Sequence, residues 1–99
     1  MARYDLYPNP FGEGFLLDVQ SDLLDELTTR VVVPLLPLHE GDKVVRRLNP
    51  VIVLDCRTYA LFTHQIGTAL KSQLREPRAN LKSLHDDLMK SFDMLFHGF

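Results

Sequence analysis

The chain has 99 residues, of which 45% are hydrophobic and 24% are charged. These values are typical of an ordinary globular protein and predict one folded domain over residues 1–99. The formal net charge is −2 and no run of Lys or Arg is concentrated in one place. Because phosphate contacts need several cations on one face, the sequence argues against direct nucleic-acid binding.

The cysteine content and the N-terminal segment indicate where the protein resides. Cys56 is the one cysteine, so no internal disulfide can form, which is typical of a reducing compartment. MARYDLYPNP lacks the apolar core of a signal peptide, and no stretch approaches the roughly 18 apolar residues of a membrane span. We therefore expect a cytoplasmic protein without membrane contact. Cys56 follows a carboxylate, Asp55, which disfavours a reactive thiolate, so we expect a buried and inert cysteine.

The first part of the sequence predicts strands separated by turns. RYDLY (3–7) alternates polar and apolar side chains, as a half-buried strand does. PNPFGEG (8–14) contains two prolines and two glycines and predicts a loop. FLLDVQ (15–20) predicts a second strand. SDLLDELTTR (21–30) mixes acids with leucines and indicates a short helical turn.

The central part predicts further strands. VVVPLLPL (31–38) is β-branched and apolar, but its prolines remove ladder donors, so we expect an edge strand or a break near Pro34. VIVLDC (51–56) is the clearest strand of the chain. TYALFTHQIGTAL (58–70) predicts another strand, interrupted near Gly67.

The last third changes to the period of a helix. After Pro77 the apolar residues are spaced by three and four positions, which places them on one stripe of a helix. The stripe consists of Leu81, Leu84, Leu88, Phe92 and Leu95, with Met89 and Phe96 flanking it. Pro77 is expected near the helix start, Asn80 is a candidate N-cap, and Gly98 is expected to end the helix. Strands followed by one C-terminal helix indicate an α+β fold with a small, strongly bent antiparallel sheet or barrel.

No combination of residues has the spacing of a catalytic or metal centre. His39, His64, His85 and His97 do not pair with one another or with Cys56 at a metal-ligand spacing, so we expect no metal and no cofactor. The glycines are too scattered for a phosphate loop, and no G-x-S-x-G motif occurs. The carboxylates of the 18–26 segment are best interpreted as a solvated acidic loop; they are Asp18, Asp22, Asp25 and Glu26. We therefore expect a protein that is not an enzyme.

Two apolar features are unusual for a surface. Leu23 and Leu24 are adjacent, and adjacent residues of a regular element cannot both face one core. We expect at least one of them to be exposed or to contact another chain; the alternative is an irregular segment that tucks both inward. Phe96 to Phe99 continue past the expected helix end, and an exposed Phe forgoes roughly 1.5–3 kcal/mol of burial. This tail either folds back onto the domain or is kept for a partner.

Several separated motifs resemble the CcdB family, the toxins of CcdA–CcdB-type toxin–antitoxin modules. They are FLLDVQSDLLDELTTRVVVPL (15–35), LNPVIVLD (48–55) and the terminal DMLFHGF (93–99). They occur in the family's order along almost the whole chain, and residues 57–83 are the least similar. The resemblance implies a homodimer whose subunits combine a CcdB/Kid-like SH3-like barrel with one C-terminal helix. It implies a toxin that binds the A subunit of DNA gyrase and traps the cleaved-DNA complex. It also implies neutralisation by a CcdA-like antitoxin, and transcription regulation.

The resemblance also assigns site residues. Gyrase binding is expected at Asp93, Phe96, His97, Gly98 and Phe99, with Leu23 and Leu24 on the neighbouring surface. Antitoxin binding is expected at Leu23, Leu24, Asp93, Phe96 and His97. Three positions depart from the best-known members of the family. His97 stands where they have tryptophan, Asp93 where asparagine is expected, and Phe99 is bulkier than their aliphatic ending.

Two other interpretations remain open at this stage. Kid- and MazF-like ribonuclease toxins share the fold, and Arg30, Arg46 or Arg47 with Asp55 would then be candidates for RNA cleavage. The missing basic groove and the terminal motif speak against a ribonuclease. The other interpretation is a decayed toxin that binds antitoxin only, and it is motivated by His97 and Asp93.

Overall fold

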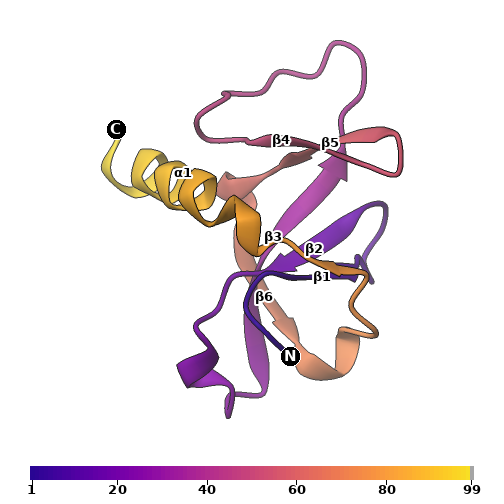
Figure 1. Ribbon diagram of the computed structural model, residues 1–99, viewed down its shortest axis with the longest axis vertical. Helices are drawn as coiled ribbons and strands as arrows, with labels where there is room; N and C mark the ends of the chain where they lie inside the picture. The colour runs from indigo at the N-terminus through magenta and orange to yellow at the C-terminus, as the bar shows by residue number, and fades with distance from the viewer. Residues whose placement is uncertain (99) are drawn as a thin grey trace.

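A curled antiparallel sheet and one C-terminal helix make up the computed structural model, which describes residues 1–98 (Figure 1). The strands are β1 (Asp5–Pro8), β2 (Phe15–Asp18), β3 (Thr29–Pro37), β4 (Val51–Leu54), β5 (Arg57–Leu61), β6 (Gly67–Leu70) and β7 (Ala79–Asn80). The helix is α1 (His85–His97). Short 3-10 turns are η1 (Asp22–Leu24), η2 (Thr63–Gln65), η3 (Lys71–Gln73) and η4 (Lys82–Leu84). This architecture confirms the predicted α+β fold with SH3-like character.

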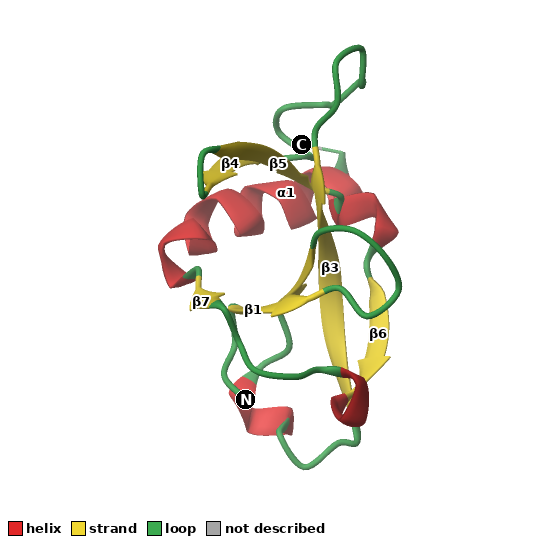
Figure 2. Cartoon of the chain, turned by 90° about the vertical axis from the view of Figure 1, so that its right-hand side faces the viewer, coloured by secondary structure: helices red, strands yellow, loops and turns green. Residues whose placement is uncertain are grey.

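The long strand β3 organises the sheet. The strand order is β4-β5-β3-β2-β1-β7, and β6 also pairs with β3. β2 lies along one side of β3, while β5 and β6 share its other side. Figure 2 shows β6 beside the lower part of β3 and the β4–β5 hairpin at its upper end. The sheet therefore curls around α1 as a half-barrel.

Pro34 lies inside this central strand, so the predicted edge position or break of β3 is wrong. β6 pairs with β3 as far as Val32, and β5 pairs with it from Leu35 onward. Pro34 lies at the junction between these two partners, and its carbonyl accepts the N–H of Phe62 at 2.8 Å. Proline lacks the backbone N–H that a hydrogen bond to a neighbouring strand needs. At Pro34 no such bond is lost, because the gap between β5 and β6 lies opposite this residue.

β4 and β5 form a hairpin with a two-residue turn. Leu54 pairs with Arg57, which leaves Asp55 and Cys56 as the turn. Both turn residues have a positive φ, 49° and 64° respectively. Cys56 is exposed at this tip, so the prediction that it is buried is wrong. The predicted strand 58–70 is two strands, β5 and β6, and the interruption lies just before Gly67, which opens β6.

α1 begins later than the sequence predicted. Pro77 does not start it, because the chain first adds β7 to the sheet beside β1. The side chain of Asn80 accepts the N–H of Lys82 at 3.1 Å and therefore serves η4 rather than α1. The predicted helix end is confirmed, since Gly98 adopts φ 79° in the left-handed region.

The helix covers one face of the sheet. Leu88 is fully buried in the main core, and Leu84 and Phe92 pack against that core. Ser91 is also fully buried and is hydrogen-bonded to the Thr63 hydroxyl and to the Leu48 carbonyl. A second, smaller cluster lies on the opposite face of the strands; it consists of Tyr7, Leu16, Val32, Ala69 and Leu74. The middle of the sheet is thus covered on both faces.

Candidate partner-binding site

The C-terminal turns of α1 carry most of the residues that the family resemblance assigned to partner binding. Asp93, His97 and Gly98 are exposed, and Phe96 has 64% of its surface in contact with solvent. The rings of Phe92 and Phe96 lie 6.3 Å apart between centroids. Phe99, the last predicted site residue, lies outside the described residues.

The two adjacent leucines lie on η1, and both are exposed. Leu23 has 93% of its surface exposed and Leu24 has 51%, which confirms that at least one points away from the core. Ser21 starts this turn, since its hydroxyl accepts the N–H of Leu23 at 3.2 Å. Such N-capping satisfies a backbone donor that a short turn would otherwise leave open.

An apolar groove joins η1 to α1. It has a volume of about 330 Å³ and is lined by Val19, Gln20, Ser21, Leu24, Val31, Ile66, Phe92 and Phe96. Leu24 and Phe96 therefore border the same hollow, although 72 positions of sequence separate them. Leu23 stands beside the groove without lining it. We refer to the exposed residues Leu23, Leu24, Asp93, Phe96, His97 and Gly98 as the C-terminal patch.

A buried ion pair holds the segment that carries the leucines. Arg30 and Asp18 both have no exposed surface. The Nε and Nη2 atoms of Arg30 donate to the two carboxylate oxygens of Asp18 at 2.7 and 3.0 Å. Nη1 of Arg30 donates to Asp25 at 3.1 Å. One guanidinium thus connects the end of β2, the start of β3 and the acidic loop between them.

Gln20 carries this connection to Leu24. Its side-chain amide donates to the Leu24 carbonyl at 3.0 Å, and its side-chain oxygen accepts the N–H of Val31 at 3.1 Å. Gln20 also donates its backbone N–H to Asp18. The path from the buried ion pair to the exposed leucine turn is therefore continuous. Such a network fixes a loop in one conformation before a partner arrives.

The charge state of the pair follows from its surroundings. Burial raises the pKa of the Asp18 carboxyl, and the hydrogen bonds from Arg30 act against that rise. Burial acts to lower the pKa of the Arg30 guanidinium, but pairing with Asp18 raises it overall. The guanidinium therefore stays protonated and needs an anionic partner beside it.

This arrangement corrects the interpretation of the acidic segment. Asp22, Asp25 and Glu26 are exposed as predicted, but Asp18 is buried and ion-paired. The sequence signal was present: a carboxylate ends the apolar run FLLD, and an arginine opens the apolar run RVVV. A charge at each of two neighbouring strand ends suits a buried pair. Gln20, Val31 and Ile66 of the groove carried no sequence signal of their own.

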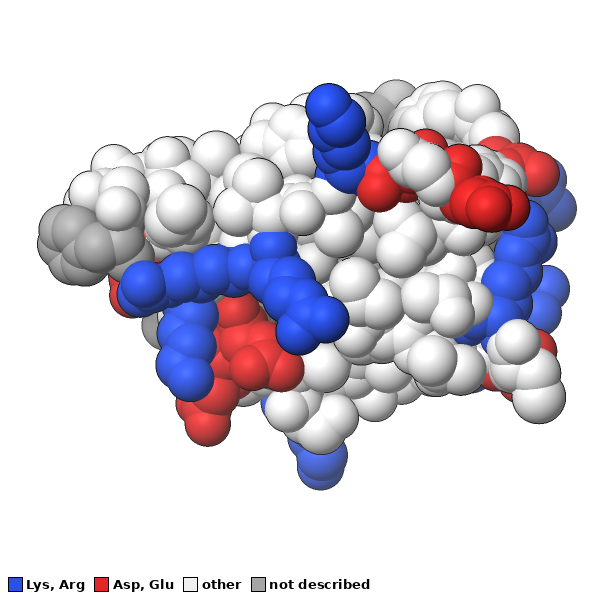
Figure 3. Space-filling view, turned by 90° about the horizontal axis from the view of Figure 1, so that it is seen from above, with Lys and Arg blue, Asp and Glu red and all other residues white. Residues whose placement is uncertain are grey.

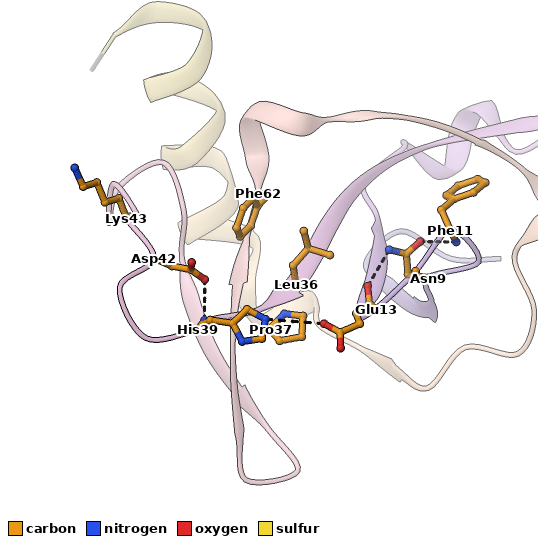
Figure 4. A pocket seen from close by; sticks show the side chains of 10 residues that line it. Asn9, Phe11, Glu13, Leu36, Pro37, His39, Asp42, Lys43 and Phe62 are labelled. Atoms are coloured by element: carbon orange, nitrogen blue, oxygen red, sulfur yellow. Dashed lines mark hydrogen bonds and ion pairs between the residues drawn. The ribbon is translucent and has the colours of Figure 1, made fainter.

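A larger hollow lies between the 8–14 loop and the loop after β3 (Figure 4). Its volume is about 590 Å³. Two of its polar side chains bond the backbone of their own loops: Asn9 bonds Phe11 and Glu13, and Asp42 bonds His39. The side chains of His39 and Glu13 approach each other to 4.0 Å between the two loops. These contacts stabilise the loops.

No three His, Cys, Asp or Glu side chains of residues 1–98 come together as a possible metal-ligand set. The helices of this range are too short or too polar to span a bilayer.

The fold and the candidate site together define a class of protein. It is a small α+β domain with an SH3-like curled sheet, which presents an apolar groove and exposed leucine and phenylalanine side chains beside its C-terminal helix. The family model described as CcdB protein matches residues 3–98. The chain therefore belongs to the CcdB family, a family of toxins from toxin–antitoxin modules. The match includes residues 57–83, the part of the sequence that is least similar to the family motifs.

Proposed function

We propose that this protein poisons DNA gyrase without catalysing a reaction. As a homodimer it binds the gyrase A subunit through the C-terminal patch and traps the cleaved-DNA complex, and a CcdA-like antitoxin neutralises it through the same patch. Family membership supports a toxin of this kind. The observation that carries the choice of surface is that Leu24 and Phe96 border one apolar groove.

The energetics of the patch suit a binding surface. Leu23 and Phe96 are large apolar side chains that are exposed in the free protein. When a partner covers them, the burial of each contributes about 1.5–3 kcal/mol to binding. Aromatic anchors at the centre of an interface supply most of its affinity. In a two-fold dimer the patch occurs twice on one assembly. A protein that binds one conformation of gyrase better than the others shifts the population toward that conformation without making or breaking a bond.

His97 and Asp93 set the strength of this binding. Both are exposed within the patch. An imidazole offers less apolar area than the indole of the best-known members, and a carboxylate adds a charge that must be desolvated on binding. The protein is therefore a weaker poison than those members, or one that is matched to its own host's gyrase.

One of the candidate residues for RNA cleavage, Arg30, does not suit that role. Arg30 has no exposed surface and is engaged with Asp18, so it cannot touch RNA in this fold. Arg46, Arg47 and Asp55 are exposed and remain the residues that an RNA-cleavage assay would test.

The experiment is a gyrase cleavage assay with the purified protein. We expect linear plasmid to accumulate after detergent and protease treatment when gyrase, ATP and the protein are present together. Leu23→Asp, on a side chain that is 93% exposed, and deletion of residues 97–99 should each reduce the linear product by at least about tenfold, which corresponds to about 1.4 kcal/mol. Val45→Asp is the matched control, because Val45 is also exposed but lies outside the patch.

Three outcomes would contradict the proposal. Equal cleavage by the deletion variant would exclude the C-terminal patch. Sequence-selective cutting of RNA by the protein alone would support the ribonuclease alternative. Normal growth of cells that express the protein without antitoxin, together with tight antitoxin binding in vitro, would indicate a decayed toxin.

A further inference from the structure

One glutamine side chain joins two walls of the apolar groove between η1 and α1. Gln20 is buried, with 5% of its surface exposed, and lines the groove together with Leu24 and Val31. Its Nε2 atom donates to the carbonyl of Leu24 at 3.0 Å, and its Oε1 atom accepts the N–H of Val31 at 3.1 Å. Leu24 belongs to η1 and Val31 to β3, so a single amide connects both walls.

The two partners fix the direction in which the amide points. A backbone carbonyl only accepts and a backbone N–H only donates, so exchanging Nε2 and Oε1 would lose both bonds. Among residues 1–98, the charged side chains that bond to Gln20 do so through its backbone. Asp18 accepts its N–H at 3.1 Å, and Arg30 donates to its carbonyl at 3.4 Å. The side chain of Gln20 therefore needs one donor and one acceptor in defined places.

Without this connection, Leu24 would be free to close the groove. η1 has no buried residue, and Leu24 keeps 51% of its surface exposed beside an apolar hollow. Contact with Phe92 or Phe96 would remove part of that surface from water, which favours a closed groove. The net stabilisation from one hydrogen bond is of the same order as the gain from burying half of a leucine side chain. The bonds of Gln20 are therefore strong enough to decide whether the groove is open.

We propose that Gln20 is a positioning residue, which holds Leu24 and the groove in the open conformation that the gyrase A subunit binds. This inference rests on the proposed function and adds a residue that acts through Leu24. Because the amide fixes the leucine turn in the free protein, binding does not include the cost of moving Leu24 into place.

The test introduces a side chain whose donor depends on pH. In Gln20→Glu the ionised carboxylate accepts the N–H of Val31 but places an acceptor against the carbonyl of Leu24. The protonated carboxyl donates an O–H to that carbonyl and restores both bonds, and burial favours this neutral form. We expect the variant to bind the gyrase A subunit at least about tenfold more weakly than the unmodified protein near pH 8, and to approach it near pH 5. The unmodified protein is measured at each pH, because other groups of both proteins titrate over this range.

A second variant, Gln20→Met, separates the hydrogen bonds from the charge. Methionine has a similar shape but can neither donate to Leu24 nor accept from Val31, so binding should be weaker at both pH values. It tests the proposal even where a buried carboxylate unfolds the first variant. NMR should show closer contacts between the Leu24 methyl groups and the Phe96 ring in this variant than in the unmodified protein. Circular dichroism establishes that the proteins compared are fully folded, since a folded variant that is merely less stable binds normally.

A change of charge by itself is tested with Gln73→Glu. Gln73 also accepts a backbone N–H, that of Leu70 at 3.0 Å, but it lies outside the groove lining. On the face seen from above, acidic and basic side chains lie next to each other (Figure 3), so this face does not carry charge of a single sign. We expect Gln73→Glu to bind the gyrase A subunit as the unmodified protein does at both pH values.

Two outcomes would overturn the proposal by themselves. Unchanged affinity of Gln20→Met would show that Leu24 needs no such bond. A loss of affinity in folded Gln20→Glu that does not recover near pH 5 would mean that the missing donor is not its cause. Failure of the unmodified protein to bind gyrase would instead refute the proposed function, and the NMR contacts of Leu24 would then show separately whether Gln20 keeps the groove open.

Discussion

Cys56 shows how a single backbone angle decides the environment of a residue. It occupies the second position of a two-residue hairpin turn with φ 64°, a region that residues other than Gly, Asn and Asp adopt at a cost. Its neighbour Asp55 has φ 49°, so the turn has the left-handed angles that favour Asp-Gly and Asn-Gly pairs. The hairpin register places Asp55 and Cys56 at the tip of the turn. The Cys56 thiol is therefore exposed, although cysteine is more often buried.

Replacing Cys56 with glycine should stabilise the protein. Glycine accepts a positive φ without steric cost, and we expect the free energy of unfolding to rise by about 1 kcal/mol. Urea unfolding followed by circular dichroism measures the change. The control is Thr58→Gly, two residues further on in β5, which should destabilise because that position is extended strand. A destabilised Cys56→Gly variant would mean that the turn does not have these angles.

At the scale of elements, the segment between β2 and β3 has little regular structure and yet is held in place. η1 contains no buried residue, so packing does not hold it. Arg30, Gln20 and the carboxylate of Asp18 supply the contacts instead. The N–H of Arg3 adds a bond of 2.8 Å to Asp22, which ties the N-terminal segment to the same loop. Polar contacts rather than a hydrophobic core therefore hold the exposed Leu23 and Leu24 in position.

Breaking the buried pair should be costly. Asp18→Asn keeps the shape of the side chain but leaves the Arg30 guanidinium buried without its full counter-charge, and we expect a loss of about 3–5 kcal/mol in stability. Denaturant unfolding measures this loss. The matched control is Asp22→Asn, whose carboxylate is exposed and lies 3.8 Å from Arg30, and it should cost less than about 1 kcal/mol. Equal effects of the two changes would contradict the assignment of Asp18 as the structural partner.

At the scale of the whole molecule, the middle of the sheet is buried on both faces. Neighbouring residues of one strand enter different cores: Leu6 and Leu17 join the cluster under α1, whereas Tyr7 and Leu16 join the smaller one. Such strands read as continuous apolar runs rather than as alternation, since neither face meets water. This explains why FLL and VVV occur in so small a protein. A curled sheet lets fewer than 100 residues enclose two clusters.

Tyr7 of the smaller cluster should make the protein less stable at alkaline pH. Burial, together with the carboxylates of Asp5 and Asp18, raises the pKa of Tyr7 from 10.0 to about 12. The neutral ring therefore contributes stability that is intact below pH 10 and is lost as the pH rises toward 12, at about 1.4 kcal/mol per pH unit. The free energy of unfolding of Tyr7→Phe, measured by chemical denaturation at fixed temperature, should fall less steeply between pH 10 and 12 than that of the unmodified protein. At pH 7 the two proteins should differ little, because the Tyr7 hydroxyl makes one bond, of 3.4 Å, to Asp5. An unchanged slope would show that Tyr7 ionises normally in the fold.

The sequence predicted several features of the fold and the candidate site. The apolar period located α1 and its end at Gly98, and the adjacency of Leu23 and Leu24 indicated exposure. Both features depend on spacing within a short stretch of chain. That Leu24 and Phe96 border one groove is a tertiary contact, and their assignment to partner binding stays a prediction.

What the amino-acid sequence determined by itself was local: the strand-forming runs, the helical stripe, the glycine stop and the apolar character of the tail. Tertiary structure decided the rest. It placed Pro34 opposite a gap between two partner strands, buried Asp18 beside Arg30, and brought Leu24 to the same groove as Phe96. These features join segments that are distant in sequence, and whether a charge is paired or a backbone group is bonded depends on what the fold places beside it.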